Sequence, residues 1–116
     1  MRTVPPEAVP RYLWAADVLV LASHGEGFGL AALEGMAAGL ALRVRDLPSL
    51  KYLVDDPAQC RPLEAPGALA AWLAESTPEV LGVQGERNRA RAADFAWSRL
   101  APQYLELYAR AQSSAP

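Results

Sequence analysis

The sequence predicts an α/β domain with a parallel sheet of about three strands flanked by helices. Residues 17–23 are apolar without alternation, which is typical of a strand buried on both faces of a parallel sheet. A glycine-rich loop at 24–29 follows and leads directly into a run of good helix formers. Short apolar runs then continue to alternate with helical segments, which favours βαβ units. So few strands make the α/β layer incomplete.

Local signals define each expected element. Pro5 and Pro6 begin a short first helix, which Pro10 confines to a turn or two. Gly39 ends the first long helix, and Ser98 caps the last one. The expected elements after the first helix are strands over 17–23, 40–44 and 59–63, and helices over 30–38, 49–54, 66–75, 78–95 and 98–112.

The composition fits one globular domain, predicted over 1–112 with a loose tail at 113–116. The chain has 116 residues, of which 52% are hydrophobic and 21% charged, and this excludes a disordered protein. No segment approaches the roughly 20 uncharged apolar residues of a membrane span. The net charge of −2 disfavours nucleic acid as a partner. Because Cys60 is the single cysteine and the start lacks a signal-peptide core, we expect a cytoplasmic protein.

Three glycines, Gly25, Gly27 and Gly29, lie between a buried strand and a helix. Open α/β sheets bind ligands there, outside the carboxyl ends of the strands. The free N–H groups of Gly29, Leu30 and Ala31 point out of a helix N-terminus that carries about half a positive charge. A phosphate or a sugar hydroxyl fits such a place. The alternative is a tight turn that binds nothing.

Two carboxylates, Glu26 and Glu34, accompany the loop. Glu34 shares a helical face with Leu30, Ala37 and Ala38, which we expect to be packed on the sheet or turned to a cleft. A buried carboxylate needs a partner, and a pair of vicinal hydroxyls would satisfy it. Alternatively, Glu34 is solvated on the helix exterior. The spacing does not suggest a glycosidase, which needs two carboxyl groups facing across one sugar.

The segment from Glu26 to Gly39 resembles the E-x7-E segment of retaining family 4 glycosyltransferases, which have the GT-B fold. Weaker matches flank it at 15–18, 69–73 and 95–98, and the resemblance extends from about 4 to 108. It implies that this chain is part of the C-terminal, Rossmann-like half that binds the nucleotide-sugar donor.

The resemblance also implies roles for individual residues. Glu34 would hold the ribose hydroxyls of the donor nucleotide. Glu26 would lie beside the transferred sugar, orienting it or stabilising charge near the anomeric carbon. The donor sugar and its diphosphate would meet the backbone of four residues, Gly27, Phe28, Gly29 and Leu30. Family members need no bound metal, so we expect no cofactor and a nucleotide sugar as the binding partner.

The chain departs from the family in length. Family members are several times longer and include an N-terminal acceptor domain. The opening strands of the donor domain, with the cations that neutralise the diphosphate, are also absent here. Because such an enzyme lowers its activation barrier chiefly by stabilising the leaving diphosphate, the isolated chain is not expected to turn over.

The segment after Gly39 departs as well. Arg43 and Arg45 interrupt a strand that should be buried, so we expect this strand to lie at an edge or to meet a partner. Tyr52 stands where the family has a glutamate, and the usual glycine before the later strand is replaced around 59–60.

Other residues carry weaker signals. Ser23 and His24 are adjacent and point apart, so we interpret them as structural rather than as nucleophile and base, although His24 could line the sugar pocket. Cys60 is expected to be a small buried hydrophobe. The charged run 86–91 is typical of a solvated helix face. Three tryptophans are expected in the core rather than stacked on a sugar: Trp14, Trp72 and Trp97.

Two functions follow. The first is a glycosyltransferase domain that carries part of the nucleotide-sugar site and works with a missing N-terminal domain. The alternative is a non-catalytic, truncated relative that uses its open sheet edge to form a homodimer or to bind a partner. The intact E-x7-E segment favours the first, and the changed segment after Gly39 favours the second.

Overall fold

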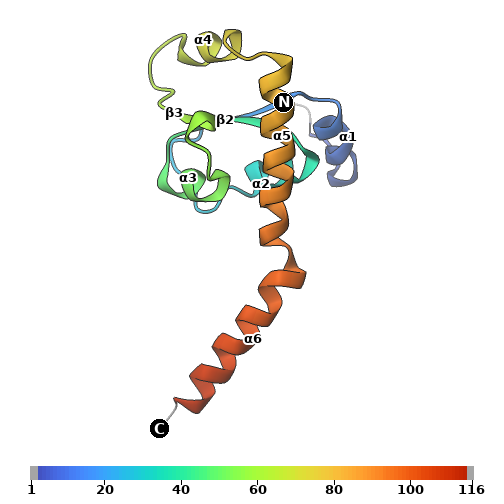
Figure 1. The fold of residues 1–116 in the computed structure, drawn as a ribbon, viewed down its shortest axis with the longest axis vertical. Helices are drawn as coiled ribbons and strands as arrows, with labels where there is room; N and C mark the ends of the chain where they lie inside the picture. The colour runs from blue at the N-terminus through green and yellow to red at the C-terminus, as the bar shows by residue number, and fades with distance from the viewer. Residues whose placement is uncertain (1–2, 115–116) are drawn as a thin grey trace.

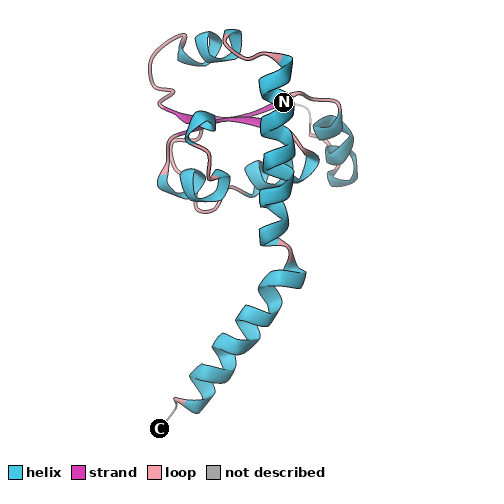
Figure 2. Cartoon of the chain, in the orientation of Figure 1, coloured by secondary structure: helices cyan, strands magenta, loops and turns pink. Residues whose placement is uncertain are grey.

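The computed structural model describes residues 3–114 as a parallel sheet with helices on both faces (Figures 1 and 2). The predicted fold class is confirmed. Met1 and Arg2 lie outside the described residues, and so do 115–116, which are half of the predicted tail. The elements are a 3₁₀ turn (Pro6–Ala8), α1 (Val9–Trp14), β1 (Val18–Leu21), α2 (Leu30–Ala38), β2 (Ala41–Arg45), α3 (Pro48–Val54), a 3₁₀ turn (Pro57–Gln59), β3 (Cys60–Arg61), α4 (Ala68–Ala74), α5 (Pro78–Ala92), a 3₁₀ turn (Ala93–Phe95) and α6 (Trp97–Ser113).

Strand β2 lies in the middle of the sheet, whose order within 3–114 is β1-β2-β3 with parallel pairing throughout. Leu42 and Val44 face α2 and α3 and form the apolar core with them. Figure 1 shows α4 on the opposite side and α5 running past the sheet. None of the described helices is both long and apolar enough to cross a membrane.

The expectation that the arginine-bearing strand lies at an edge or meets a partner is wrong. Every residue of β2 is buried, and the strand is flanked by β1 along 41–44 and by β3 at Val44 and Arg45. Arg43 is 2% exposed, and its guanidinium donates to Leu42 O, Gln84 Oε1 and Ser76 Oγ at 2.7–3.0 Å. It also lies 5.0 Å from the Trp72 ring. Because these partners come from α4, α5 and the segment between them, the charge is accommodated within one chain.

Two side-chain amides extend the hydrogen bonding of β2 where β3 is too short to pair with it. Gln59 Oε1 accepts from Leu42 N at 2.8 Å, and Asn88 Nδ2 donates to Leu40 O at 2.8 Å. Gln59 and Asn88 also exchange two hydrogen bonds with each other, at 2.8 and 2.9 Å. Both residues are fully buried, so this network satisfies backbone groups that would otherwise be buried without partners.

Helix α5 approaches α2 so closely that Gly85 packs on the backbone of Gly39. A Cβ at Gly85 would overlap Gly39 O, whereas a Cβ at Gly82, one turn earlier, would meet open space. Gly39 itself ends α2 as predicted, with a φ of 83°. This contact packs α5 against the amino end of β2.

The prediction that three tryptophans lie in the core holds for Trp72, which is 3% exposed, and is wrong for the other two. Trp14 and Trp97 are each 73% exposed. Trp14 ends α1, which lies beside α2, and Trp97 begins α6, which projects away from the sheet (Figure 1). The sequence pattern of these helices is amphipathic, but within 3–114 their apolar faces have little to pack against.

Cys60, the first residue of β3, belongs to the apolar core, as predicted. Burial, followed by the nearby carboxylate of Asp56, raises the pKa of its thiol to about 11. The folded state therefore holds the neutral thiol.

We expect Gly85→Ala to lower the free energy of unfolding by about 1–3 kcal/mol, because the added methyl meets a backbone carbonyl that cannot turn aside. The matched change in the same helix, Gly82→Ala, should raise it by about 0.5–1 kcal/mol through helix propensity. Urea denaturation of both variants measures the difference. Equal effects would contradict the close approach of α5 and α2.

We expect iodoacetamide to alkylate Cys60 at pH 8 at least about 100-fold more slowly in the folded chain than in the urea-unfolded chain, because each pKa unit is tenfold in thiolate. Since the folded pKa is raised, the contribution to stability is present below pH 9 and is lost as the pH rises toward 11. Rates that match in the two states would contradict the burial of the thiol.

Candidate functional site

The candidate site lies at the carboxyl ends of the strands, where the loop 24–29 follows β1 and enters α2. Gly29 precedes α2 in the left-handed conformation, with φ 89° and ψ 52°. No side chain caps this end of α2, and its first turn holds no acidic residue. The first backbone N–H groups of the helix are therefore open to a ligand, in the positive end of the helix dipole.

Three contacts hold the loop in place. Ser49 Oγ, in the first turn of α3, donates to Glu26 O at 2.8 Å. Gly29 packs on Leu50, so closely that a Cβ would lie 2.7 Å from Leu50 Cδ2. The ring of Phe28 meets the ring of Phe95 edge-on, with centroids 5.5 Å apart. The loop is thus fixed by α3 and by the turn that precedes α6.

The tip of the loop is open. A Cβ added at Gly25 or at Gly27 would meet no atom within 4 Å, so neighbouring side chains do not fill the turn. Glu26 is half-buried between these glycines. Among the described residues, no ion pair engages its carboxylate.

Glu34 lies on the exposed side of α2. The face packed on the sheet is formed by Ala32, Gly35 and Met36, so the expectation that Glu34 shares a sheet-packed face is wrong. The exposure of Glu34 fits the alternative that its carboxylate is solvated on the helix exterior. Glu34 also borders an open hollow of about 440 Å³ between α2 and α1. The other residues that line it are Pro6, Val9, Pro10, Leu13, Trp14, Ala37 and Ala38. Glu34 also makes no ion pair with the described residues.

Sequence reasoning missed two charged residues at the same edge of the sheet. Arg45, the last residue of β2, places Nη1 3.3 Å from His24 Nδ1 and 2.8 Å from Glu64 Oε1. His24 follows β1 and Glu64 follows β3, so the three side chains form a row across the strand ends. The available signal was positional, because each charge stands at or just after the end of a predicted strand.

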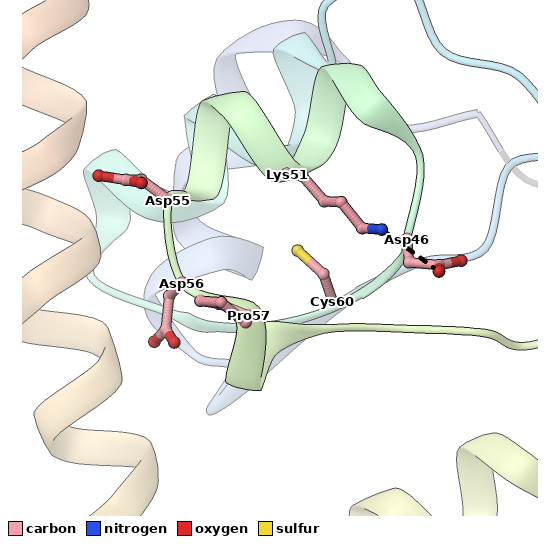
Figure 3. A pocket seen from close by; sticks show the side chains of 6 residues that line it. All are labelled: Asp46, Lys51, Asp55, Asp56, Pro57 and Cys60. Carbon is pink, nitrogen blue, oxygen red and sulfur yellow. Dashed lines mark hydrogen bonds and ion pairs between the residues drawn. The ribbon is translucent and has the colours of Figure 1, made fainter.

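A second hollow, of about 380 Å³, lies beside α3 and the start of β3 (Figure 3). Three of its charged side chains already have partners: Lys51 pairs with Asp46 at 3.5 Å, and Asp56 accepts from Ala58 N and from Gln59 Nε2 at 3.0 Å. The thiol of Cys60 is held neutral. No set of three histidine, cysteine or carboxylate ligands with metal-binding geometry occurs within 3–114. This hollow therefore offers less chemistry than the strand ends do.

Comparison with known proteins points to one family. The family model described as "Glycosyl transferases group 1" matches residues 2–91. Similar curated relatives include the D-inositol 3-phosphate glycosyltransferases of three bacteria. That of Nocardia farcinica is 34% identical over 113 residues, covering 92% of this chain and 25% of the relative. That of Saccharomonospora viridis is 34% identical over 104 residues, covering 86% and 24%. That of Kineococcus radiotolerans is 32% identical over 126 residues, covering 96% and 29%.

The chain thus spans about a quarter of the length of these relatives. No solved structure gave a significant match. The family model covers all three described strands and the whole of the glycine loop, which are the parts that form the strand-end site. The chain belongs to the group 1 glycosyltransferases.

Proposed function

We propose that this chain carries part of the nucleotide-sugar donor site of a retaining, GT-B-type glycosyltransferase. The observation that carries the proposal is the uncapped N-terminus of α2, which follows the glycine loop at the strand ends. The carboxylates of Glu26 in this loop and Glu34 in α2 make no ion pair with the described residues. The family match supports the transferase interpretation and gives no support to a non-catalytic module.

The backbone of the loop would receive the donor's diphosphate and sugar. Gly27, Phe28, Gly29 and Leu30 supply N–H groups at the positive end of the α2 dipole, and an anion gains most at that end. The open space at Gly27 lets a ligand approach the backbone closely. Because Ser49 and Phe95 already fix the loop, little conformational entropy is lost when a donor binds.

The two carboxylates would act on different parts of the donor. Glu34, which borders the hollow beside α1, would accept hydrogen bonds from the two ribose hydroxyls. Glu26, at the centre of the loop, would lie beside the transferred sugar. There it would orient the sugar or stabilise positive charge near the anomeric carbon in the transition state.

Turnover would need the remaining three-quarters of a full-length relative. The relatives' names say that they act on D-inositol 3-phosphate, and we propose a phosphorylated or hydroxylated acceptor of this kind for the complete enzyme. The acceptor side and the cations that neutralise the leaving diphosphate would come from outside this chain. The isolated chain would therefore bind a donor without transferring its sugar, and we propose that it does so without a metal.

Binding can be tested on the chain alone by ¹⁵N–¹H correlation spectra recorded with up to millimolar UDP-glucose, GDP-mannose or ADP-glucose. We expect saturable shifts of the amides of residues 27–31. Glu34→Gln should weaken binding about 10- to 100-fold, because hydrogen bonds to a charged acceptor contribute about 1.5–3 kcal/mol. The matched control is Glu86→Gln, an exposed carboxylate on α5, which should leave affinity unchanged. Unshifted loop amides, or equal affinities of the two variants, would contradict the donor site.

A further inference from the structure

The row of His24, Arg45 and Glu64 remains outside the proposed donor site. These residues stand at the carboxyl ends of β1, β2 and β3, and Arg45 is in the middle. Its Nη1 donates to Glu64 Oε1 at 2.8 Å and lies 3.3 Å from His24 Nδ1. Since a guanidinium can only donate, Nδ1 of His24 accepts, and the neutral ring carries its proton on Nε2. His24 is exposed, so this N–H is available to a ligand.

Arg45 is much more buried than Glu64, the carboxylate with which it pairs. The residue is 8% exposed, while the Glu64 side chain is 60% exposed. Nε of Arg45 is buried without a hydrogen-bond partner, and Glu64 engages the guanidinium through one oxygen at one nitrogen. An arginine offers five donors in a planar fork that suits a bidentate oxyanion. Most of that capacity is unused in the described residues.

The face of the sheet around Arg45 is positively charged. Arg43 shares this face, because alternate residues of a strand point the same way. Arg61 is the register partner of Arg45 on β3. Arg43 and Arg61 lie 5.0 and 4.9 Å from the Trp72 ring. Burial, and then the charge of Arg61, lower the pKa of Arg43. Within 3–114, the carboxylates paired with the three arginines are those of Glu64 and Glu75, both of which are exposed.

We propose that Arg45 and His24 form an anion subsite for a phosphate group, and that Glu64 occupies this subsite when no ligand is bound. A phosphate presents three oxygens, so it can accept from two nitrogens of the Arg45 fork at once, whereas Glu64 engages Arg45 through one oxygen. His24 contributes by accepting from Nη1 through Nδ1, which orients the guanidinium. Glu64 is the exposed member of the pair and holds Arg45 by one hydrogen bond, so a phosphate can replace it while the buried guanidinium keeps an anionic partner. The subsite goes beyond the donor site, because Arg45 and Glu64 are not assigned to the donor and His24 is considered only as a lining residue of the sugar pocket.

The test uses the whole chain and follows the Nε–H resonance of Arg45 and the ring resonances of His24 during titration with inorganic phosphate at constant ionic strength. Sodium chloride is the reference salt. We expect saturable shifts with phosphate and none with chloride. Glu64→Gln should tighten phosphate binding about two- to fivefold, since the competing carboxylate is gone.

The matched control is Glu75→Gln, which removes one negative charge from the same face but frees Arg61 rather than Arg45. It should change phosphate affinity less than Glu64→Gln does. No saturable shift in the parent chain or in Glu64→Gln would overturn the proposal, and so would an equal gain in the two variants. Both changes are at exposed positions, so neither outcome depends on a variant that fails to fold.

A second arm adds UDP to the phosphate-saturated chain to identify the source of the phosphate group. Loss of the phosphate-induced shifts would assign the subsite to the donor diphosphate. Shifts that persist while residues 27–31 respond to UDP would assign it to a separate phosphate monoester. Either result supports the subsite. If UDP-glucose fails to bind the loop while phosphate still shifts Arg45, the donor-site proposal fails and the subsite stands.

Discussion

The amide pair formed by Gln59 and Asn88 is the interaction on which the rest of this structure depends. Strand β3 is two residues long and pairs with the last part of β2 alone. At Leu40 and Leu42, side-chain amides take the place of a neighbouring strand. Because a buried backbone group without a partner is costly, β2 can remain central only while these two side chains are in place. They also join β2 to α5, and α5 in turn packs on α2.

This central position of β2 determines what the strand ends can do. Arg45 reaches the carboxyl edge because β2 is flanked on both sides, and its neighbours His24 and Glu64 come from the two adjoining strands. The glycine loop is held at the same edge by Ser49 and Phe95. The uncapped N-terminus of α2 and the largely buried Arg45 thus lie at the same edge of a short sheet, at the carboxyl ends of its strands. Both features favour the binding of oxyanions, and the phosphate groups of nucleotide sugars and sugar phosphates are oxyanions.

Much of this arrangement could be predicted from the sequence. The apolar run at β1, the glycines of the loop and Gly39 at the end of α2 carry local signals, and the structure has them where expected. The place of β2 could not be predicted, because the groups that accommodate Arg43 come from Ser76 and Gln84, far along the chain. A charged residue within a strand is normally taken to indicate that the strand is exposed to solvent or lies at the edge of the sheet. Tertiary hydrogen bonds overrode that pattern here.

The candidate site divides in the same way. Glu26 and the loop glycines were identified from their order in the chain, and the open tip of the loop fits that interpretation. The face of Glu34 is ambiguous in the sequence, because Leu30 and the alanines near it suggest packing, whereas in the structure Gly35 packs on Leu19 of the sheet. Arg45 and Glu64 are separated by α3, a 3₁₀ turn and β3, so no local pattern joins them. The contact between Arg45 and Glu64 depends on the order of the strands in the sheet, which no local sequence pattern predicts.

Native-state hydrogen exchange of the Leu42 amide tests the central role of Gln59 and Asn88 most directly. This N–H is fully buried and donates to Gln59 Oε1 rather than to a strand. If the amide pair holds β2 in place, Leu42 will exchange among the slowest amides, with an opening free energy equal to that of global unfolding. Exchange as fast as that of the exposed helix α6 would show that the middle of the sheet opens locally, and would contradict this account of the fold and of its strand ends.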